Sequence, residues 1–178
     1  MTATREWLDL EAEARFTPVE LREVQTAPAE ETRQLLAFTL AGEEYAIEIG
    51  SIEEIVRVRP VTEVPFAPPF CPGLVSLRGR IVTIIDLRVR LGLPAEAPGR
   101  GARIIVSSDR GRTVGLLVDG VSGVIRLGPS DLEATPVVVG GIDGEFVQGL
   151  GRIGGRLVIL LNLPRVLEFT IEGDGAAR

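Results

Sequence analysis

The sequence predicts a small all-β fold, a barrel or a sandwich, for the part of the chain that begins at Leu35. Three observations support this fold class. Short runs rich in Val, Ile and Leu recur at intervals of about ten residues, with Gly, Asp and Pro between them, which is typical of short strands joined by turns. The chain has 178 residues, 45% of them hydrophobic, so it can bury one good core or two small ones. Segments with helical features are scarce.

Each apolar run is predicted to be a strand. In chain order the runs are Leu35–Leu40, Tyr45–Ile49, Glu54–Val58, Ile81–Leu87, Arg103–Ser107, Thr113–Val118, Gly123–Leu127, Phe146–Ile153 and Arg156–Leu161. Turn residues separate several of them: Ala41–Glu43, Ser108–Gly111, Asp119–Gly120 and Gly154–Gly155. The Gly154–Gly155 pair predicts a tight hairpin, because consecutive glycines accept the positive φ angles of primed turns. Short helical turns are expected only at Gly50–Glu53 and after Asn162, where Pro164 lies near a helix start.

The first 33 residues are predicted to be a separate extension, partly helical or disordered. Residues 1–34 hold eight acidic and four basic residues, which supply −4 of the formal net charge of −6. Thr17, Pro18 and Glu20 have the chemistry of a helix start, so a short helix to about Val24 is expected. Residues 26–31 have the composition of a linker, and the domain boundary is placed near Arg33.

The stretch Pro94–Gly101 interrupts the predicted strands near the middle of the β region. It could be a loop, or it could divide two small barrels. We place the first barrel at about residues 34–92, completed by a C-terminal strand, and the second at about 101–155. Residues 169–178 are then a C-terminal tail.

Composition argues against several classes of function. A net charge of −6 would repel nucleic-acid phosphates and an anionic membrane surface. The chain has no His, the commonest general base and metal ligand, and its one cysteine, Cys71, has no partner for an internal disulfide. The thiol is expected to be buried or incidental, in a reducing, cytoplasmic environment. No apolar run approaches the roughly 20 residues that span a bilayer. We expect no catalytic residue, no metal and no cofactor.

The pattern Gly149-x-Gly151-x-x-Gly154, with Glu168 further on, fits the dinucleotide-binding fingerprint. That fingerprint requires a helix that opens at the glycines and holds the pyrophosphate on its N-terminal N–H groups. Here the glycines are followed by the predicted strand Arg156–Leu161. We therefore interpret them as glycines that relieve crowding in a twisted hairpin.

Charged residues give two further observations. The carboxylate pairs Glu43-Glu44 and Glu53-Glu54 are adjacent, so in a strand their side chains should point to opposite faces rather than converge for catalysis. Residues 57–90 carry six arginines against two acidic residues, a charge of +4: Arg57, Arg59, Arg78, Arg80, Arg88 and Arg90. Arg78 and Arg80 flank Gly79 where a loop enters a strand, a position typical of binding residues. A solvated surface is the plainer alternative.

Several of these segments resemble the CheW family of chemotaxis coupling proteins. The resemblance runs over about residues 34–168, through Leu36–Leu40, Glu43–Ile47, Ile52–Ile55, Phe70–Gly79, Ile81–Arg88, Val114–Val121, Gly149–Gly151 and Leu157–Asn162. It implies two SH3-like five-stranded β barrels packed together through an apolar interface, with few short helices. It also implies a non-catalytic adaptor that couples methyl-accepting chemoreceptors to a CheA-type histidine kinase, and that is recruited to inner-membrane receptor arrays only through its partners.

The resemblance also implies binding residues. It assigns the cytoplasmic tip of the receptor to Ile52, Gly73, Leu74, Arg78 and Val124. It makes Glu54 and Arg78 an ion pair, with Arg78 supporting the binding surface. It assigns the regulatory domain of the kinase to Val121, Arg103, Ile104, Ile105 and Val106. An ordinary core role for Ile52, Leu74 and Val124, and a turn requirement for Gly73, are the alternatives.

This sequence departs from the family pattern at two places. Ser76 stands where relatives often have Asn before Leu-Arg-Gly, and Arg103 begins a strand that is usually apolar. Two other classes of function remain as alternatives. One is a small β-barrel ligand-binding or enzymatic module, favoured by the glycine pattern and the arginines. The other is an OB-like nucleic-acid binder, which would require surface aromatics and positive net charge.

Overall fold

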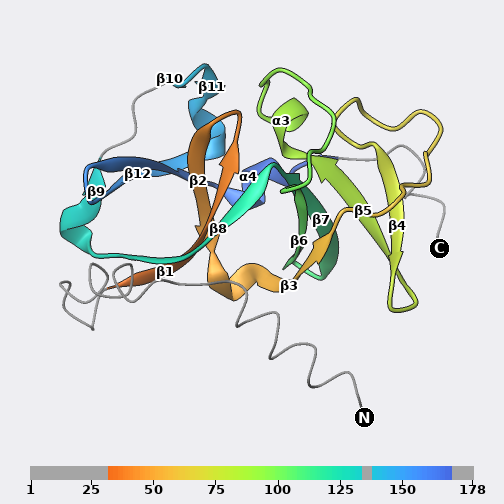
Figure 1. Ribbon diagram of the computed structural model, residues 1–178, viewed down its shortest axis with the longest axis horizontal. Coiled ribbons are helices and arrows are strands. Elements are labelled where there is room, and N and C mark those ends of the chain that lie inside the picture. Colours follow the sequence, from red (N-terminus) through yellow and green to blue (C-terminus); the bar gives the residue numbers. More distant parts are fainter. Residues whose placement is uncertain (1–31, 134–137, 170–178) are drawn as a thin grey trace, which may run out of the picture.

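The computed structural model describes residues 32–133 and 138–169. The predicted helix that begins at Thr17 and the predicted linker at 26–31 lie outside the described residues. The described chain forms two curved sheets, shown side by side in Figure 1, and a two-stranded ribbon. Its helices are single turns. Within the described residues, no helix is long and apolar enough to cross a membrane.

The six-stranded sheet has the order β8-β1-β2-β13-β12-β9. Its strands are β1 (Arg33–Leu40), β2 (Glu43–Glu48), β8 (Gly120–Leu127), β9 (Leu132–Glu133), β12 (Val147–Ile153) and β13 (Arg156–Leu161). Neighbours pair antiparallel except β2 and β13, which are parallel. The 3-10 turn η3 (Pro129–Asp131) joins β8 at one edge to β9 at the other, so the sheet curls toward closure.

The five-stranded sheet has the order β3-β6-β7-β5-β4. Its strands are β3 (Ile52–Arg57), β4 (Gly73–Leu77), β5 (Arg80–Asp86), β6 (Arg103–Asp109) and β7 (Arg112–Val118). Its one parallel pair is β5 with β7. The ribbon and the remaining short helices are β10 (Val138–Val139), β11 (Ile142–Asp143), η2 (Ile49–Ser51), η4 (Gly144–Phe146), α3 (Leu87–Arg90) and α4 (Leu163–Val166).

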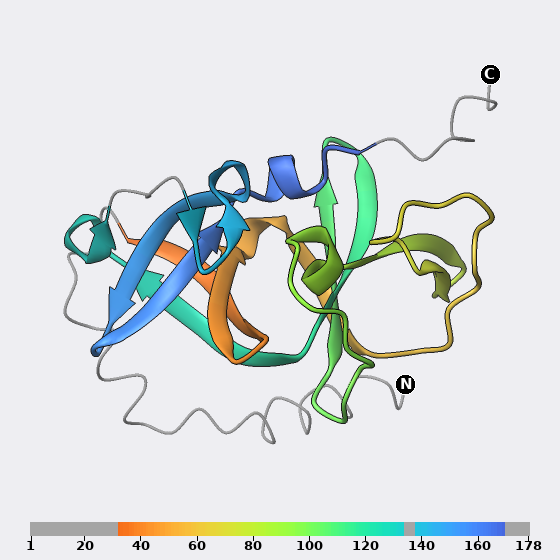
Figure 2. The same cartoon turned by 90° about the horizontal axis from the view of Figure 1, so that it is seen from above.

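The two sheets share one topology. In each, a hairpin (β1–β2 or β6–β7) is followed by a strand that crosses to the other sheet, β3 or β8. A second hairpin in each sheet pairs its last strand parallel to the first hairpin and ends in one helical turn. In the six-stranded sheet this hairpin is β12–β13, which pairs β13 with β2 and ends in α4; in the five-stranded sheet it is β4–β5, which precedes β6–β7 in the chain, pairs β5 with β7 and ends in α3. Asp86 and Asn162 cap these turns through their side-chain oxygens. The crossing strands tie the halves together (Figure 2).

The predicted all-β class with few short helices is confirmed, but the predicted division of the chain differs from the strand order. β3 lies within residues 34–92 and belongs to the five-stranded sheet, while β8 lies within 101–155 and belongs to the six-stranded sheet. The Pro94–Gly101 stretch is a loop between α3 and β6, on the five-stranded side. Sequence patterns could not reveal the exchange, because an apolar strand has the same pattern whichever sheet it joins.

The largest core cluster lies between the sheets. It joins Phe38 and Tyr45 of the six-stranded sheet to Ile85, Ile105 and Leu116 of the five-stranded sheet. Each sheet also has an apolar cluster on its other face. The central strands are therefore buried on both faces, which explains why their sequences read as continuous apolar runs rather than alternating ones.

An ion pair links the two sheets beside this core. Arg88 Nε donates to Asp119 Oδ1 at 2.8 Å, and Arg88 Nη2 donates to Asp119 Oδ2 at 2.5 Å. The backbone N–H of Ala41, in the β1–β2 turn, donates to Asp119 Oδ2 at 2.8 Å. Burial raises the pKa of Asp119, but the hydrogen bonds from Arg88 and Ala41 and the charge of Arg88 outweigh it, so the net pKa is lowered. The carboxylate is held in its charged form.

Asp119→Asn is expected to lower the free energy of unfolding by about 2 kcal/mol at pH 7, because a charged hydrogen-bond acceptor is lost. A depressed folded-state pKa adds stability above the unfolded value of about 3.9 and loses it as pH falls through the folded value. The gap between wild type and variant should therefore close on acidification below about pH 4. Urea unfolding at a series of pH values measures this gap. A gap that stays constant to pH 2 would contradict the assignment.

Candidate functional site

The first candidate site is the seam, defined as the space between β3 and the β4–β5 hairpin. β3 and β4 are the two edge strands of the five-stranded sheet. A cavity of about 290 Å³ lies there. Its apolar floor is made by Leu77, Val82 and Val106, all buried. Its charged rim is Glu53, Glu54, Arg78 and Arg80.

Two ion pairs bridge the seam. Arg78 Nη2 lies 3.4 Å from Glu54 Oε2, and Arg80 Nη2 lies 3.0 Å from Glu53 Oε2. Arg80 also donates to Thr113 Oγ1 at 2.8 Å. The Arg78 side chain is 67% exposed while that of Glu54 is 19% exposed, so the pair has one solvated member. Such a pair contributes little to stability, and its effect is to orient the groups at the rim.

Glu53 and Glu54 both line this cavity, against the expectation that adjacent carboxylates in a strand would diverge. The register of β3 against β6 shifts between Ile52 and Glu54, so Glu53 lies in a β-bulge. A bulge breaks the strict alternation of side chains. Each carboxylate is paired with its own arginine rather than with the other.

The residues assigned to the receptor are distributed over both sheets. Ile52 opens β3, and Gly73 and Leu74 open β4, at the other end of that strand from Arg78. Ile52 and Leu74 are half-buried. Val124 lies on β8, in the six-stranded sheet, and is 39% exposed. The structure therefore brings Glu54 and Arg78 together across the seam, and Val124 lies on the sheet that does not contain them.

Three of the residues assigned to the kinase require a correction. Ile104, Ile105 and Val106 are at most 1% exposed, and β6 is an interior strand paired with β3 and β7. Their side chains are core and cannot meet a partner. Arg103 is half-buried and donates to the carbonyls of Arg100 and Ala102, and Val121 is half-buried against the inter-sheet core.

The arginines of residues 57–90 do not form one surface. Arg88 takes part in the inter-sheet pair with Asp119. Arg90, on α3, lies over the rings of Phe70 and Phe146, with its Cζ 4.6 and 4.9 Å from their centroids. It also donates to the carbonyls of Val166, Arg165 and Glu168 at the end of α4. The sequence shows Arg90 only as part of a charge excess, because the carbonyls that it binds lie 75 to 78 residues away along the chain.

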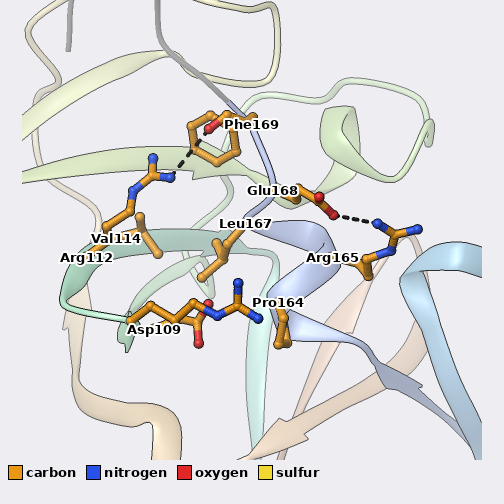
Figure 3. Close-up of a pocket in the computed structure, with 9 residues that line it drawn as sticks. Asp109, Arg112, Val114, Pro164, Arg165, Leu167, Glu168 and Phe169 are labelled. Carbon is orange, nitrogen blue, oxygen red and sulfur yellow. Dashed lines mark hydrogen bonds and ion pairs between the residues drawn. The ribbon is translucent and has the colours of Figure 1, made fainter. Parts of the chain in front are cut away.

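A second cavity, of about 570 Å³, lies between the β6–β7 turn and the segment that follows α4 (Figure 3). Arg112 lies over the Phe169 ring, 5.3 Å from its centroid, and donates to the Phe169 carbonyl at 3.4 Å. Arg165 donates to Glu168 at 2.6 Å. Arg112, Arg165 and Glu168 of this wall thus have partners, and the lining contains no nucleophile beside a general base.

The glycine pattern at residues 149–154 and Cys71 both have structural rather than catalytic roles. Gly154 and Gly155 form the β12–β13 hairpin turn with φ of 52° and 80°, and no helix opens at the glycine pattern. Cys71 is 5% exposed, and burial raises the pKa of its thiol despite a backbone hydrogen bond at Gly73. A buried, protonated thiol is a poor nucleophile. Both interpretations made from the sequence are confirmed.

Comparison with known proteins places these features in a family. The sequence pattern of the CheW-like domain matches residues 34–170. The chain is 35% identical to the chemotaxis protein CheW of Rhizobium meliloti, over 75% of this chain and 86% of the relative. It is 36% identical to CheW of Klebsiella aerogenes, over 76% of this chain and 82% of the relative.

A solved structure agrees with these relatives. The crystal structure of the scaffolding protein TtCheW from Thermoanaerobacter tengcongensis is similar to this fold with a TM-score of 0.72 and 32% sequence identity. The similarity covers 78% of this chain and 94% of the other. The match in both sequence and strand arrangement excludes a chance likeness of small β folds.

Proposed function

The chain belongs to the CheW-like domain family, and from this we propose that it is a non-catalytic scaffold that couples methyl-accepting chemoreceptors to a CheA-type histidine kinase. The family match over residues 34–170 is the observation that carries the proposal. The described residues fit it, because the four charged groups at the rim of the seam form two ion pairs rather than a cluster around a reacting centre. We place the protein in the cytoplasm, recruited to inner-membrane receptor arrays through its partners.

The receptor-facing surface is proposed to comprise Ile52, Gly73, Leu74, Arg78 and Val124. A receptor tip is helical, and helices are bound in grooves by apolar anchors with a few orienting charges. Ile52 and Leu74 are half-buried apolar groups on edge strands, where a partner can cover the part that remains exposed. Arg78 supplies an orienting charge at the rim, held toward the seam by Glu54.

For the kinase, Val121 and Arg103 remain as proposed contacts. Both are half-buried. Arg103 pairs with Val118 at the end of β7, and Val121 is near the start of β8, where the fold passes from the five-stranded to the six-stranded sheet. Their limited exposure means that other residues must supply most of the contact area.

Reconstitution tests the proposed function directly. Purified kinase and a receptor signalling fragment are combined with and without this protein, and kinase autophosphorylation is measured. The proposal predicts strong stimulation that requires all three components. Equal kinase activity with and without the protein would mean that coupling is the wrong function.

Arg78→Ala is expected to leave stability almost unchanged while lowering receptor-dependent kinase stimulation about tenfold. Surface substitutions usually alter the free energy of unfolding by less than about 0.5 kcal/mol, whereas one lost charged contact at an interface is worth about 1.4 kcal/mol, or tenfold. Arg152→Ala is the matched control, since the Arg152 side chain is 57% exposed, against 67% for Arg78, and pairs with Glu133 on the other sheet. If Arg78→Ala and Arg152→Ala stimulate the kinase equally, Arg78 has no special role.

A further inference from the structure

The loop of residues 58–72 lies at the end of the molecule away from the six-stranded sheet, seen in yellow in Figures 1 and 2. It joins β3 to β4 and contains five prolines: Pro60, Pro65, Pro68, Pro69 and Pro72. Proline fixes φ and removes freedom from the unfolded chain, so this loop loses less entropy on ordering than a flexible one of equal length.

Phe66 projects from this loop and is 94% exposed, more than any other large hydrophobic residue of the described chain. Its φ is +63°, in the left-handed region that is unfavourable for a bulky side chain. The N–H of Ala67 donates to the carbonyl of Val64 at 3.3 Å, so Phe66 follows Pro65 as the second central residue of a tight turn. Gly or Asn meets that conformation at low cost. The backbone conformation of Phe66 therefore disfavours folding, and its exposed ring gains no hydrophobic burial in return.

The base of the loop is fixed on both sides of Phe66. Thr62 and Leu74 exchange two backbone hydrogen bonds of 2.8 Å. The carbonyl of Phe70 accepts from the N–H of Asp86 at 2.7 Å, and the Phe70 ring packs edge-on against Phe169 at 5.1 Å. The exposed ring is therefore presented on a rigid support, and a partner that receives it has little ordering entropy to overcome.

We propose that Phe66 is a docking anchor that inserts into an apolar pocket on the regulatory domain of the kinase, an assignment that rests on the proposed coupling function. A single aromatic ring on a convex loop needs a concave, folded surface, and buried aromatic side chains dominate the energetics of such contacts. The receptor tip is a helix that is itself received by a groove, so its shape does not match a protruding ring. An unfavourable backbone conformation such as that of Phe66 is retained most often at functional sites.

Phe66→Asn separates this role from a structural one. Asn accepts the positive φ and the solvent, so the variant should unfold at the same temperature as wild type or at a higher one, while its affinity for the isolated kinase regulatory domain falls at least tenfold. Ile81→Asn is the control, because Ile81 lies on β5 of the same half of the fold and is also a highly exposed apolar residue, at 66%. It should bind the kinase domain like wild type. Binding of a receptor signalling fragment should be unchanged in both variants.

Titration calorimetry with the kinase domain gives the decisive comparison. Equal affinity of wild type and Phe66→Asn for the kinase domain would overturn the proposed anchor role of Phe66. Equal losses of affinity in Phe66→Asn and Ile81→Asn would overturn it as well. A loss confined to receptor binding, or to self-association measured by sedimentation, would overturn the choice of partner. If wild type does not bind the kinase domain at all, the proposed coupling function fails rather than the role of Phe66 alone.

Discussion

Gly73→Ala is expected to lower the free energy of unfolding by about 4 kcal/mol, through overpacking and backbone strain together. A Cβ at this position would lie 2.7 Å from the carbonyl carbon of Thr62 and 2.8 Å from Cγ1 of Val61, and closer still to the Thr62 oxygen. That oxygen accepts the Leu74 N–H of the bridge that fixes the base of the 58–72 loop. The backbone φ of +145° is one that L side chains rarely adopt. Urea unfolding measures the loss.

Gly79→Ala is the matched control for this prediction. Gly79 also has positive φ, at +78°, but no atom lies within 4 Å of its Cβ position. Its variant should lose only about 1 kcal/mol, the cost of positive φ alone. Equal losses in the two variants would contradict the steric explanation. A large loss at Gly73 alone would mean that any receptor-binding defect of Gly73 variants acts first through the fold.

The strands with continuous apolar runs could be predicted from the sequence because their composition and turn residues are local signals. β13 is found with the predicted bounds, Arg156–Leu161, and its hairpin turn is formed by the predicted glycine pair. β4 (Gly73–Leu77) was missed, since it is short and follows a proline-rich loop. α3 was not predicted, and its first residue, Leu87, was placed at the end of a strand, because the formation of this helical turn depends on the Asp86 side chain that caps it. The exchange of β3 and β8 is a tertiary property with no local signature.

The candidate site was predicted only in part, and the reason differs from residue to residue. The Glu54–Arg78 pair followed from the resemblance and is present. Ile104 to Val106 were assigned to a surface because an apolar strand looks the same in sequence whether a partner or the protein's own core covers it. Phe66 was not singled out, because its exposure and its positive φ become visible only in three dimensions. The partners of Arg88 and Arg90 lie too far along the chain for a sequence pattern to pair them.

Arg90→Met is expected to lower the free energy of unfolding by about 3 kcal/mol, because methionine fills much of the same space without the charge or the donors. Arg90 Nε donates to the Val166 carbonyl at 2.8 Å, and Nη2 donates to the Glu168 carbonyl at 3.1 Å. The Val166 carbonyl ends α4 and that of Glu168 lies two residues beyond it, so neither has a partner within the helix. Hydrogen bonds that involve a charged group are worth about 1.5 to 3 kcal/mol, and a cation over an aromatic ring adds about 0.5 to 2 kcal/mol.

The loss of stability in Arg90→Met should be concentrated at α4, to which Arg90 donates its hydrogen bonds. Hydrogen exchange should accelerate most at the amides of Val166 and Leu167, which bond to the carbonyls of Asn162 and Leu163 within α4. Arg165→Met is the control, since Arg165 lies within α4 itself and pairs with exposed Glu168, and it should leave the unfolding midpoint unchanged. Faster exchange spread evenly over both sheets would mean that Arg90 stabilises the fold as a whole. Faster exchange confined to α4 and the loop of residues 58–72 would identify Arg90 as the residue that fixes the end of α4, which follows the six-stranded sheet, to α3, which follows the five-stranded sheet.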